Sequence, residues 1–568
     1  MLYDFLISSI CVFLTLKCSQ SHELALEQKK HLSIVTPQMF GAKANGIDDD
    51  TEAIRKASKC NADTLYFPKG IYVINIPNGL DKSVANNFFY SIPYTIIGED
   101  KNSTIIRLGK ENGDADNYKG FESIFSFGGR NTHVEVKDIT FDFNYKYNPI
   151  TQYTSNHVGV EQNGQQMAIN AHRVSSLIVD NCRFIEHSGT NCIVYRANAE
   201  SDTLFCKVSN CTFERIGKKS YYRGNEAYHD CSTVGIHADT REQKHKLYCY
   251  VENNSFEGVG GNAFDACECS ADEFIFRNNT VTGYCVGVMP LTAHEGTTAL
   301  IENNNFLSVG RGVGVWSNNN DVRREIGVEG FKELNIANNI ITVDINRFIK
   351  RPSFNNILNK NGCYYPGGYF GAVCSMGLWT KSIGSLKICN NDIVFKDCSK
   401  IPNKFITETV NAYNGSVVGL YSFFEGTPNQ AYCDKFIFEN NNIKGAPTTI
   451  VRLTPFNMIN YMSISYNIIT NCWVNLKEEI INGGLISLHP SCYHNVDGVK
   501  WGDFYIQNNV VDFPYSLNDN ATVFFMINAN NLNKKTSRLV LKGNFTKLPR
   551  YGEYRNKTNN KQFNIITR

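Results

Sequence analysis

The sequence predicts an all-β protein that winds as a single-stranded parallel β-helix, closed at its N-terminal end by a short capping α-helix. Two observations predict the coil: a short phrase with paired asparagines recurs along the chain, and an alternating strand pattern precedes its copies. A third predicts the cap, because one amphipathic helical pattern near the N-terminus is followed by strand patterns.

The asparagine phrase marks one corner of each coil. Its closest copies are 25 residues apart. Larger gaps fit the same unit plus an insertion, and a fixed period of this size marks a stacked architecture. The copies are Asp138–Phe141, Asn181–Phe184, Asn210–Phe213, Asn253–Phe256, Asn278–Val281, Asn303–Phe306, Asn338–Ile341, Asn390–Ile393, Asn440–Ile443, Tyr466–Ile469 and Asn508–Val511.

Asparagine suits such a corner for two physical reasons. It tolerates left-handed backbone better than most residues. Its amide can also hydrogen-bond to the same asparagine one coil above. Strand patterns such as Ser176–Asp180, Phe274–Arg277 and Leu334–Ala337 lead into the corners.

The N-terminal block predicts a helix and then strands. Asp49 or Asp50 can cap a helix whose apolar face is Ala53, Ile54 and Ala57. Thr64–Ile74 then predicts two short strands around a Pro-Lys-Gly turn, and two more are predicted over Tyr94–Gly98 and Ser103–Arg107.

This block resembles the N-terminal signature of the pectate-lyase-like superfamily, and most closely its rhamnogalacturonase/epimerase-like branch. The matching pieces are Phe40–Ala42, Asn45–Gly46, Asp49–Thr51, Ala53–Ile54 and Phe67–Tyr72. The resemblance implies a right-handed β-helix whose open end is covered by the helix, since an uncovered end would expose unpaired strand edges. We therefore expect Asp48, Asp49 and Asp50 to be turn and cap residues rather than catalysts.

The domain layout follows from these patterns. The apolar run from Phe5 to Leu16 is too short to span a bilayer and predicts a signal peptide, although Asp4 stands where a positive charge is usual. An exported protein would be secreted, periplasmic or at the cell surface. The predicted parts are a signal peptide at 1–22, the cap at 33–84, the β-helix at 85–548 and a basic polar tail at 549–568.

Charge and cysteine content narrow the partners. The net charge is +2, from 56 basic and 54 acidic residues, which gives no reason to expect nucleic acid. After the N-terminal run, no segment is long and apolar enough to predict a membrane span. Of the 19 cysteines, Cys182 and Cys211 share one slot of the repeat, which predicts small buried hydrophobes in a ladder rather than disulfides.

A β-helix exposes flat columns of side chains that suit a long, repetitive substrate such as a polysaccharide. Aligning the glycine-rich strands places Val194, His237, Asp265, Met289 and Trp316 in one outward column. His237 would then lie beside Asp265, with Asp239 diagonal to Asp265 at roughly 8 Å. Such a pair suits an inverting glycosidase. Trp316 could stack on a sugar ring, and Arg241 could hold a substrate carboxylate.

A basic, aromatic insertion precedes the His237 strand. Lys218, Lys219 and Arg223 could attract an acidic sugar, and Tyr222 could line a groove. A lyase needs a cation to neutralise a uronate and a base to remove a proton, and this insertion could supply them. The alternative is an ordinary solvated loop.

Departures from the family's galacturonan hydrolases make that activity doubtful. Their Asn-Thr-Asp and Gly-His-Gly motifs are absent, and Asp49-Asp50 belongs to the cap. No run of carboxylates resembles the calcium site of pectate lyases, so no metal or other cofactor is predicted. Glu161, Glu268 and Glu425 are weaker catalytic candidates.

The sequence therefore predicts an enzyme that cleaves glycosidic bonds of a complex, acidic polysaccharide, by hydrolysis or by β-elimination. Hydrolysis would use Asp239 and Asp265 as acid and base, with His237 tuning one of them. Two alternatives stay open: a non-catalytic glycan binder or tailspike-like adhesin, for which a trimer is an option, and a polysaccharide epimerase.

Overall fold

The computed structural model describes a large part of the chain. The described residues are 33–75, 87–91, 93–110, 123–129, 132–148, 167–187, 191–197, 204–217, 220–222, 225–227, 231–237, 245–259, 263–292, 296–316, 330–348, 371–377, 382–397, 416–420, 432–447, 449–453, 458–471, 486–488, 500–512, 522–526, 538–546, 552–556 and 564–567. The predicted signal peptide, residues 1–22, lies outside them.

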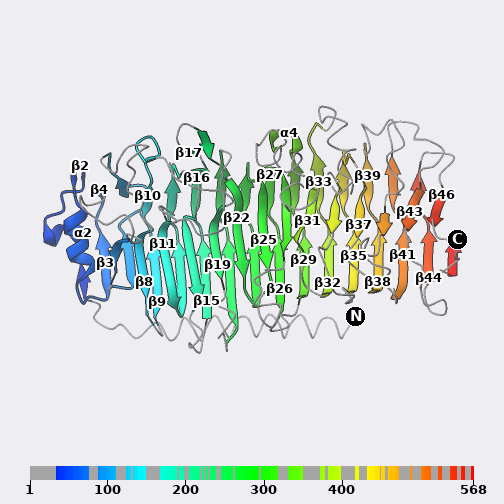
Figure 1. Cartoon of the computed structure of the whole chain (residues 1–568), viewed down its shortest axis with the longest axis horizontal. Helices are drawn as coiled ribbons and strands as arrows, with labels where there is room; N and C mark the ends of the chain where they lie inside the picture. Colours follow the sequence, from blue (N-terminus) through cyan, green and yellow to red (C-terminus); the bar gives the residue numbers. More distant parts are fainter. Residues whose placement is uncertain are drawn as a thin grey trace.

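Over these residues the strands form three long parallel sheets, A, B and C, which the chain visits in turn on each coil (Figure 1). Sheet A contains β1 (Ile34–Val35), β3 (Thr64–Phe67), β6 (Thr95–Gly98), β9 (His133–Lys137), β12 (Ser176–Asp180), β15 (Leu204–Ser209), β20 (Leu247–Glu252), β23 (Glu273–Arg277), β26 (Thr297–Glu302), β29 (Phe331–Ala337), β32 (Ser382–Cys389), β35 (Tyr432–Glu439), β38 (Met458–Ser465), β41 (Lys500–Gln507), β44 (Arg538–Lys542) and β47 (Asn564–Thr567).

Sheet B contains β2 (Asn45–Asp49), β4 (Gly70–Ile74), β7 (Thr104–Leu108), β10 (Thr140–Asp142), β13 (Arg183–Ile185), β16 (Thr212–Ile216), β21 (Ser255–Gly258), β24 (Thr280–Thr282), β27 (Asn305–Val309), β30 (Ile340–Val343), β33 (Asp392–Phe395), β36 (Asn442–Lys444), β39 (Ile468–Thr470), β42 (Val510–Asp512) and β45 (Phe545–Thr546).

Sheet C contains β5 (Asn87–Tyr90), β8 (Ser123–Gly128), β11 (Met167–Val174), β14 (Ile193–Ala197), β19 (Cys231–His237), β22 (Ala263–Ser270), β25 (Val286–Leu291), β28 (Arg311–Trp316), β31 (Gly371–Gly377), β34 (Val418–Leu420), β37 (Val451–Leu453), β40 (Ile486–Leu488), β43 (Thr522–Met526) and β46 (Gly552–Asn556). This arrangement confirms the predicted parallel β-helix.

The strand stack extends past both predicted boundaries of the β-helix. Strands β1 to β4 come from the segment assigned to the cap, and β46 and β47 come from the segment assigned to a polar tail. Alternating Ile and Val in β4 and a short apolar pair in β47 are enough to pair with a ready-made sheet edge, although neither segment carries the asparagine phrase.

Buried asparagines form a hydrogen-bonded ladder between sheets A and B. The first residue of every copy of the phrase has a positive φ, as predicted for the corner. The second residue points inward. For example, Asn304 Nδ2 donates to Asn339 Oδ1 at 3.0 Å and to Phe276 O at 2.9 Å, and Asn304 Oδ1 accepts from the backbone N–H of Asn279 at 2.9 Å. The ladder runs through Asn254, Asn279, Asn304, Asn339, Asn391, Asn441, Asn467, Asn509 and Asn544.

The phrase also builds the core. Its fourth residue is an inward phenylalanine in several coils, and the rings of Phe184, Phe213 and Phe256 stack with centroids 4.8 and 4.6 Å apart. Cys182 and Cys211 take the asparagine slot on the preceding coils and are buried, which confirms the predicted cysteine ladder.

The helix α2 (Thr51–Ser58) covers the N-terminal end of the stack together with the 3₁₀ helix η1 (Pro37–Phe40) (Figure 1). Ala53, Ile54 and Ala57 are buried, as predicted. Asp49 Oδ1 accepts from the Thr51 N–H at 2.9 Å, whereas Asp50 Oδ1 accepts from the Lys43 N–H at 2.7 Å and holds the preceding loop. The aspartates therefore serve the cap.

The stability of this fold is expected to fall in acid. The bidentate partner Arg183 holds the pKa of Glu214 below its usual value. A lowered folded pKa adds stability above the unfolded value of about 4.3, and that stability is lost as the pH falls through the folded pKa. Chemical denaturation between pH 6 and pH 3 should show this loss, and Glu214→Gln should reduce it. An unchanged pH slope in the variant would contradict the assignment.

Candidate functional site

The register of sheet C defines two rows of side chains. Glu268, His172, Arg196 and His237 are at least partly exposed, whereas most other members of the two rows are buried. The first, named the Glu268 row, contains Ser126, Asn170, Val194, Gly235, Glu268 and Met289. The second, named the His237 row, lies two residues further along each strand and contains Gly128, His172, Arg196, His237, Ser270, Leu291, Trp316 and Gly377.

The predicted neighbourhood of His237 and Asp265 is wrong. The register places Asp265 opposite Ser232 and places His237 opposite Ser270. His237 is five residues past Ser232, about 16 Å along a strand at ~3.3 Å per residue. A bulge at the start of β22 adds one residue, and the partner of the buried Ile236 is Cys269 rather than Phe264.

Three polar side chains from β19 and β22 meet at this bulge. Ser232 Oγ lies 3.0 Å from Asp265 Oδ2 and 2.9 Å from Glu268 Oε2. Asp265 is 1% exposed, whereas Glu268 is only partly buried. A hydroxyl has one proton to donate, so both contacts are satisfied together when one of the two carboxyl groups carries a proton. Ser232 therefore ties the partly exposed Glu268 to the buried Asp265.

His237 leans toward the same cluster. A Cβ added at Gly235 would lie 3.2 Å from His237 Nε2 and 2.7 Å from Asn191 Nδ2, so the imidazole and the amide occupy the space that Gly235 leaves. Gly235 is the direct register partner of Glu268, and neighbouring strands are about 4.8 Å apart. His237 and Glu268 therefore share one surface.

Gly235→Ala is expected to displace His237 and to lower kcat/KM about tenfold for the reaction that this site supports, because small misplacements of groups that contact a substrate are costly. Gly128→Ala is the matched control, since a Cβ there meets nothing closer than 3.7 Å. Steady-state kinetics of both variants checks this. Equal activity of the two variants would show that the position of His237 does not depend on the missing side chain at Gly235.

The thiols beneath the cluster are not nucleophiles. Burial raises the pKa of Cys269 to about 11, and burial followed by the charge of Asp265 raises the pKa of Cys267 well above its usual value. Burial also raises the pKa of Tyr284, which shares a 2.9 Å hydrogen bond with Thr233. These groups stay protonated and form the floor of the site.

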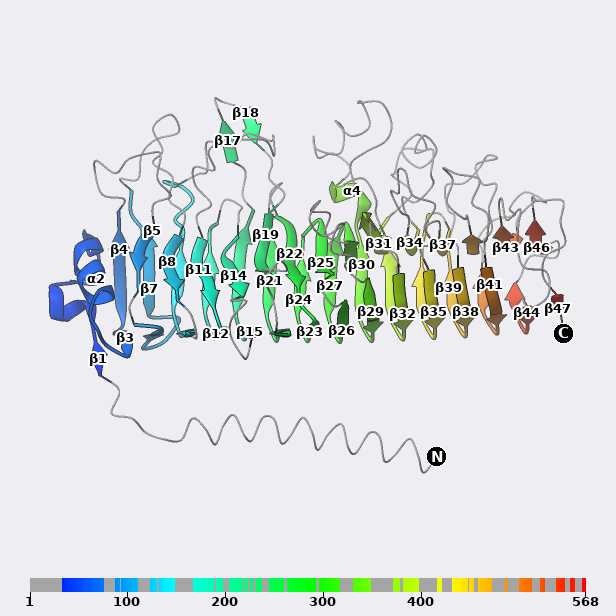
Figure 2. The same cartoon turned by 60° about the horizontal axis from the view of Figure 1, so that its bottom comes forward.

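Of the other predicted site residues, the structure describes Trp316 and Tyr222. Trp316 lies in the His237 row, three coils from His237, as its backbone register shows. Tyr222 belongs to β17 (Ser220–Tyr222), which pairs with β18 (Asn225–Ala227) in a hairpin just before β19. This hairpin projects from the same side of the stack as the helix α4 (Ile345–Phe348) (Figure 2). Asp239, Arg241, Lys218, Lys219 and Arg223 lie outside the described residues.

The glycine alignment placed Arg196 in an outward column without assigning it a role, did not include Ser232 or His172, and left Glu268 as a weaker candidate. One signal was available in the sequence. Cys267-Glu268-Cys269 alternates apolar, charged and apolar residues, and the structure shows the two cysteines buried on either side of the partly exposed glutamate. If the two cysteines are taken as core residues, Glu268 between them is correctly predicted to face outward.

No group of three His, Cys, Asp or Glu side chains converges as a metal site within the described ranges. Of the helices in this part of the chain, none has the length and apolar composition needed to cross a bilayer.

Comparison with solved structures defines the handedness of the coil. A mutant tailspike protein of E. coli bacteriophage HK620 in complex with a pentasaccharide is similar with a TM-score of 0.53 and 13% identity, over 92% of this chain and 78% of the tailspike chain. The chain has the right-handed parallel β-helix fold. This confirms the fold that the N-terminal resemblance implied.

Other comparisons add little to this result. The HK620 tailspike protein in a further pentasaccharide complex gives a TM-score of 0.50 at 13% identity, over 90% of this chain and 78% of that chain. The mannuronan C-5 epimerase AlgE4 A-module of Azotobacter vinelandii gives 0.34 at 12% identity, over 93% and 99% of the two chains, a score too low to support an argument. No protein-family model and no curated protein sequence matches the chain.

Proposed function

We propose that this protein hydrolyses glycosidic bonds of a polysaccharide that carries acidic sugars, and that the chemistry takes place on sheet C around Glu268. The fold supports the substrate class, since the HK620 tailspike with the same coil was solved with a pentasaccharide. A polymer lying along the stack would cross the accessible members of the His237 row, which are Gly128, His172, Arg196 and His237, one coil every ~4.8 Å.

The observation that carries the proposal is the Ser232 hydroxyl between a buried and a partly exposed carboxyl group. Glycoside hydrolysis needs a carboxylic acid that protonates the leaving oxygen. Glu268 is the proposed acid because it is the more exposed of the two. Asp265 and Ser232 are positioning residues that hold the carboxyl group of Glu268.

Asp265 does not supply the second catalytic carboxylate in this proposal. The contacting oxygens of Asp265 and Glu268 both lie near Ser232 Oγ and so are less than about 6 Å apart, below the ~6.5–9.5 Å of an inverting pair. A retaining enzyme would need Asp265 to reach the sugar, but this side chain is buried. Asp239, two residues beyond His237, is the proposed base.

The His237 row supports an acidic substrate. The exposed Arg196 lies between His172 and His237 in register, so a guanidinium and two imidazoles line three successive coils. Guanidinium groups bind carboxylates with charge-assisted, often bidentate hydrogen bonds. The insertion with Lys218, Lys219 and Arg223, which precedes the His237 strand in the sequence, would add further positive charge. The predicted signal peptide supports a location outside the cytoplasm.

The same row favours a second candidate, β-elimination. Arg196 would neutralise the uronate carboxylate, and His237 would remove the C5 proton. This mechanism uses the His237 row and leaves Glu268 without a direct role.

Incubation of the purified protein with acidic and neutral polysaccharides separates these activities. We expect shorter chains by size-exclusion chromatography and no new ultraviolet absorbance. Shorter chains with a rise in absorbance would indicate elimination, since that reaction leaves an unsaturated sugar. Unchanged chain length on every acidic polymer would contradict the proposal and favour the binder or the epimerase.

A further inference from the structure

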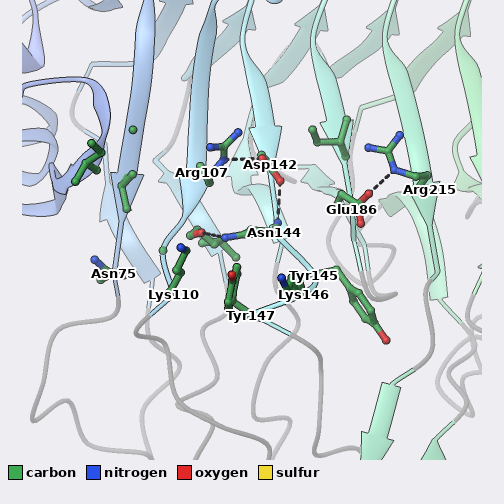
Figure 3. Close-up of a pocket in the computed structure, with 16 residues that line it drawn as sticks. Asn75, Arg107, Lys110, Asp142, Asn144, Tyr145, Lys146, Tyr147, Glu186 and Arg215 are labelled. Atoms are coloured by element: carbon green, nitrogen blue, oxygen red, sulfur yellow. Dashed lines mark hydrogen bonds and ion pairs between the residues drawn. The ribbon is translucent and has the colours of Figure 1, made fainter.

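A polar hollow lies on sheet B near the N-terminal cap, away from the rows of sheet C (Figure 3). Its volume is about 720 Å³, within the ~300–1,000 Å³ typical of ligand pockets. The ends of β4, β7, β10, β13 and β16 form its floor, and the turn that follows β10 forms one wall. All of its lining residues lie within the ranges that the structure describes.

The wall is held in place by two asparagine side chains. Asn144 adopts φ +48° and turns the chain out of β10. Its Nδ2 donates to Leu108 O at 2.8 Å, and Asn148 Nδ2 donates to Gly109 O at 3.0 Å. The turn is therefore fixed to the end of β7, and Tyr147 is held beside Lys110.

The floor of the hollow is neutralised by its own ion pairs. Arg107 Nε lies 2.7 Å from Asp142 Oδ2. Arg215 forms an ion pair with Glu186 further along the floor (Figure 3). These four side chains leave no surplus charge at this level of the hollow.

The wall, in contrast, carries surplus positive charge. Lys110 Nζ and Lys146 Nζ lie 5.0 and 5.3 Å from the centroid of the Tyr147 ring, on either side of it in Figure 3. Among the described residues, neither lysine forms an ion pair with a carboxylate. Both ammonium groups therefore converge on one half-buried aromatic ring with no acidic partner from this part of the chain.

We propose that this hollow binds an acidic sugar of the uronate class. An exposed cation–π contact is weaker than a charge-assisted hydrogen bond to a carboxylate, so both lysines can exchange the ring for a carboxylate. The Tyr147 ring then faces the apolar side of the sugar, as aromatic rings do in carbohydrate sites. None of the sheet C residues lines this hollow, so it would hold the polymer without cleaving it.

Lysine footprinting of the intact protein tests this binding site directly. The protein is labelled with an acetylating reagent, with or without trigalacturonate, and each lysine is quantified by mass spectrometry. We expect at least fivefold protection of Lys110 and Lys146 and unchanged labelling of the exposed controls Lys59 and Lys444. The neutral trisaccharide maltotriose should not protect any of the four. Tyr147→Leu should abolish the protection, whereas Tyr147→Phe should keep it.

Three outcomes would overturn the inference. If neither trigalacturonate nor a glucuronate-containing tetrasaccharide changes the labelling of Lys110 and Lys146, no uronate binds there. Equal protection by inorganic sulfate would indicate a simple anion site without sugar recognition. Loss of protection in Glu268→Gln, in which the hollow is intact, would assign the effect to sheet C.

Discussion

Replacing Glu268 by glutamine is expected to lower kcat for polysaccharide cleavage about a thousandfold, because general acid catalysis contributes ~10²–10⁴ and the amide cannot protonate a leaving oxygen. The amide keeps the size of the side chain and can still accept the 2.9 Å hydrogen bond from Ser232. KM should change little, since Glu268 is proposed to act in the transition state rather than in binding. Steady-state kinetics on the best substrate of the polysaccharide panel measures this.

Glu273→Gln is the matched control for that loss. Glu273 is also partly buried and lies five residues further along the chain, but on β23 of sheet A. Its substitution should leave kcat within about twofold, since surface changes away from a site have small effects. Equal losses in the two variants, or full activity in Glu268→Gln with a normal unfolding midpoint, would remove Glu268 from the mechanism.

Replacing Asn304 by alanine is expected to lower the free energy of unfolding by about 4 kcal/mol, since several buried partners would lose their hydrogen bonds at ~1–3 kcal/mol each. The lost partners are Asn339 Oδ1, Phe276 O and the amides of Asn279. Denaturant titration followed by circular dichroism gives the value.

Asn305→Ala is the control one residue away. Asn305 is exposed on β27, and its substitution should change the free energy of unfolding by less than about 0.5 kcal/mol. A loss below about 1 kcal/mol in Asn304→Ala would mean that the ladder tolerates a gap, for example by admitting water, and that the asparagine column is not a main source of stability.

The fold was predictable because the same short sequence phrase forms the same backbone turn at each corner. An αL residue and an inward amide are both favoured by asparagine, so eleven copies of one phrase mark eleven corners. The capping helix was equally local, since Ala53, Ile54 and Ala57 follow a helical period and are buried.

The candidate site was predictable only in part, since its geometry depends on register between strands. Shifting the pairing by one residue reverses which side chains face outward. The predicted pairing of His237 with Asp265 is wrong by five residues, since the partner of His237 is Ser270, and nothing in the local sequence gives this register. The alignment of glycine-rich strands led to His237 as a candidate, whereas the surroundings of Ser232 and Arg196 depend on strands that are about 20 to 40 residues away in the chain.

A crystal structure of the Glu268→Gln variant with a bound acidic oligosaccharide would show whether the substrate lies on sheet C. We expect a sugar lying over β19 and β22, with a glycosidic oxygen within hydrogen-bond distance of residue 268 and a carboxylate near Arg196. An oligosaccharide that leaves sheet C empty and occupies sheet A or sheet B alone would contradict it.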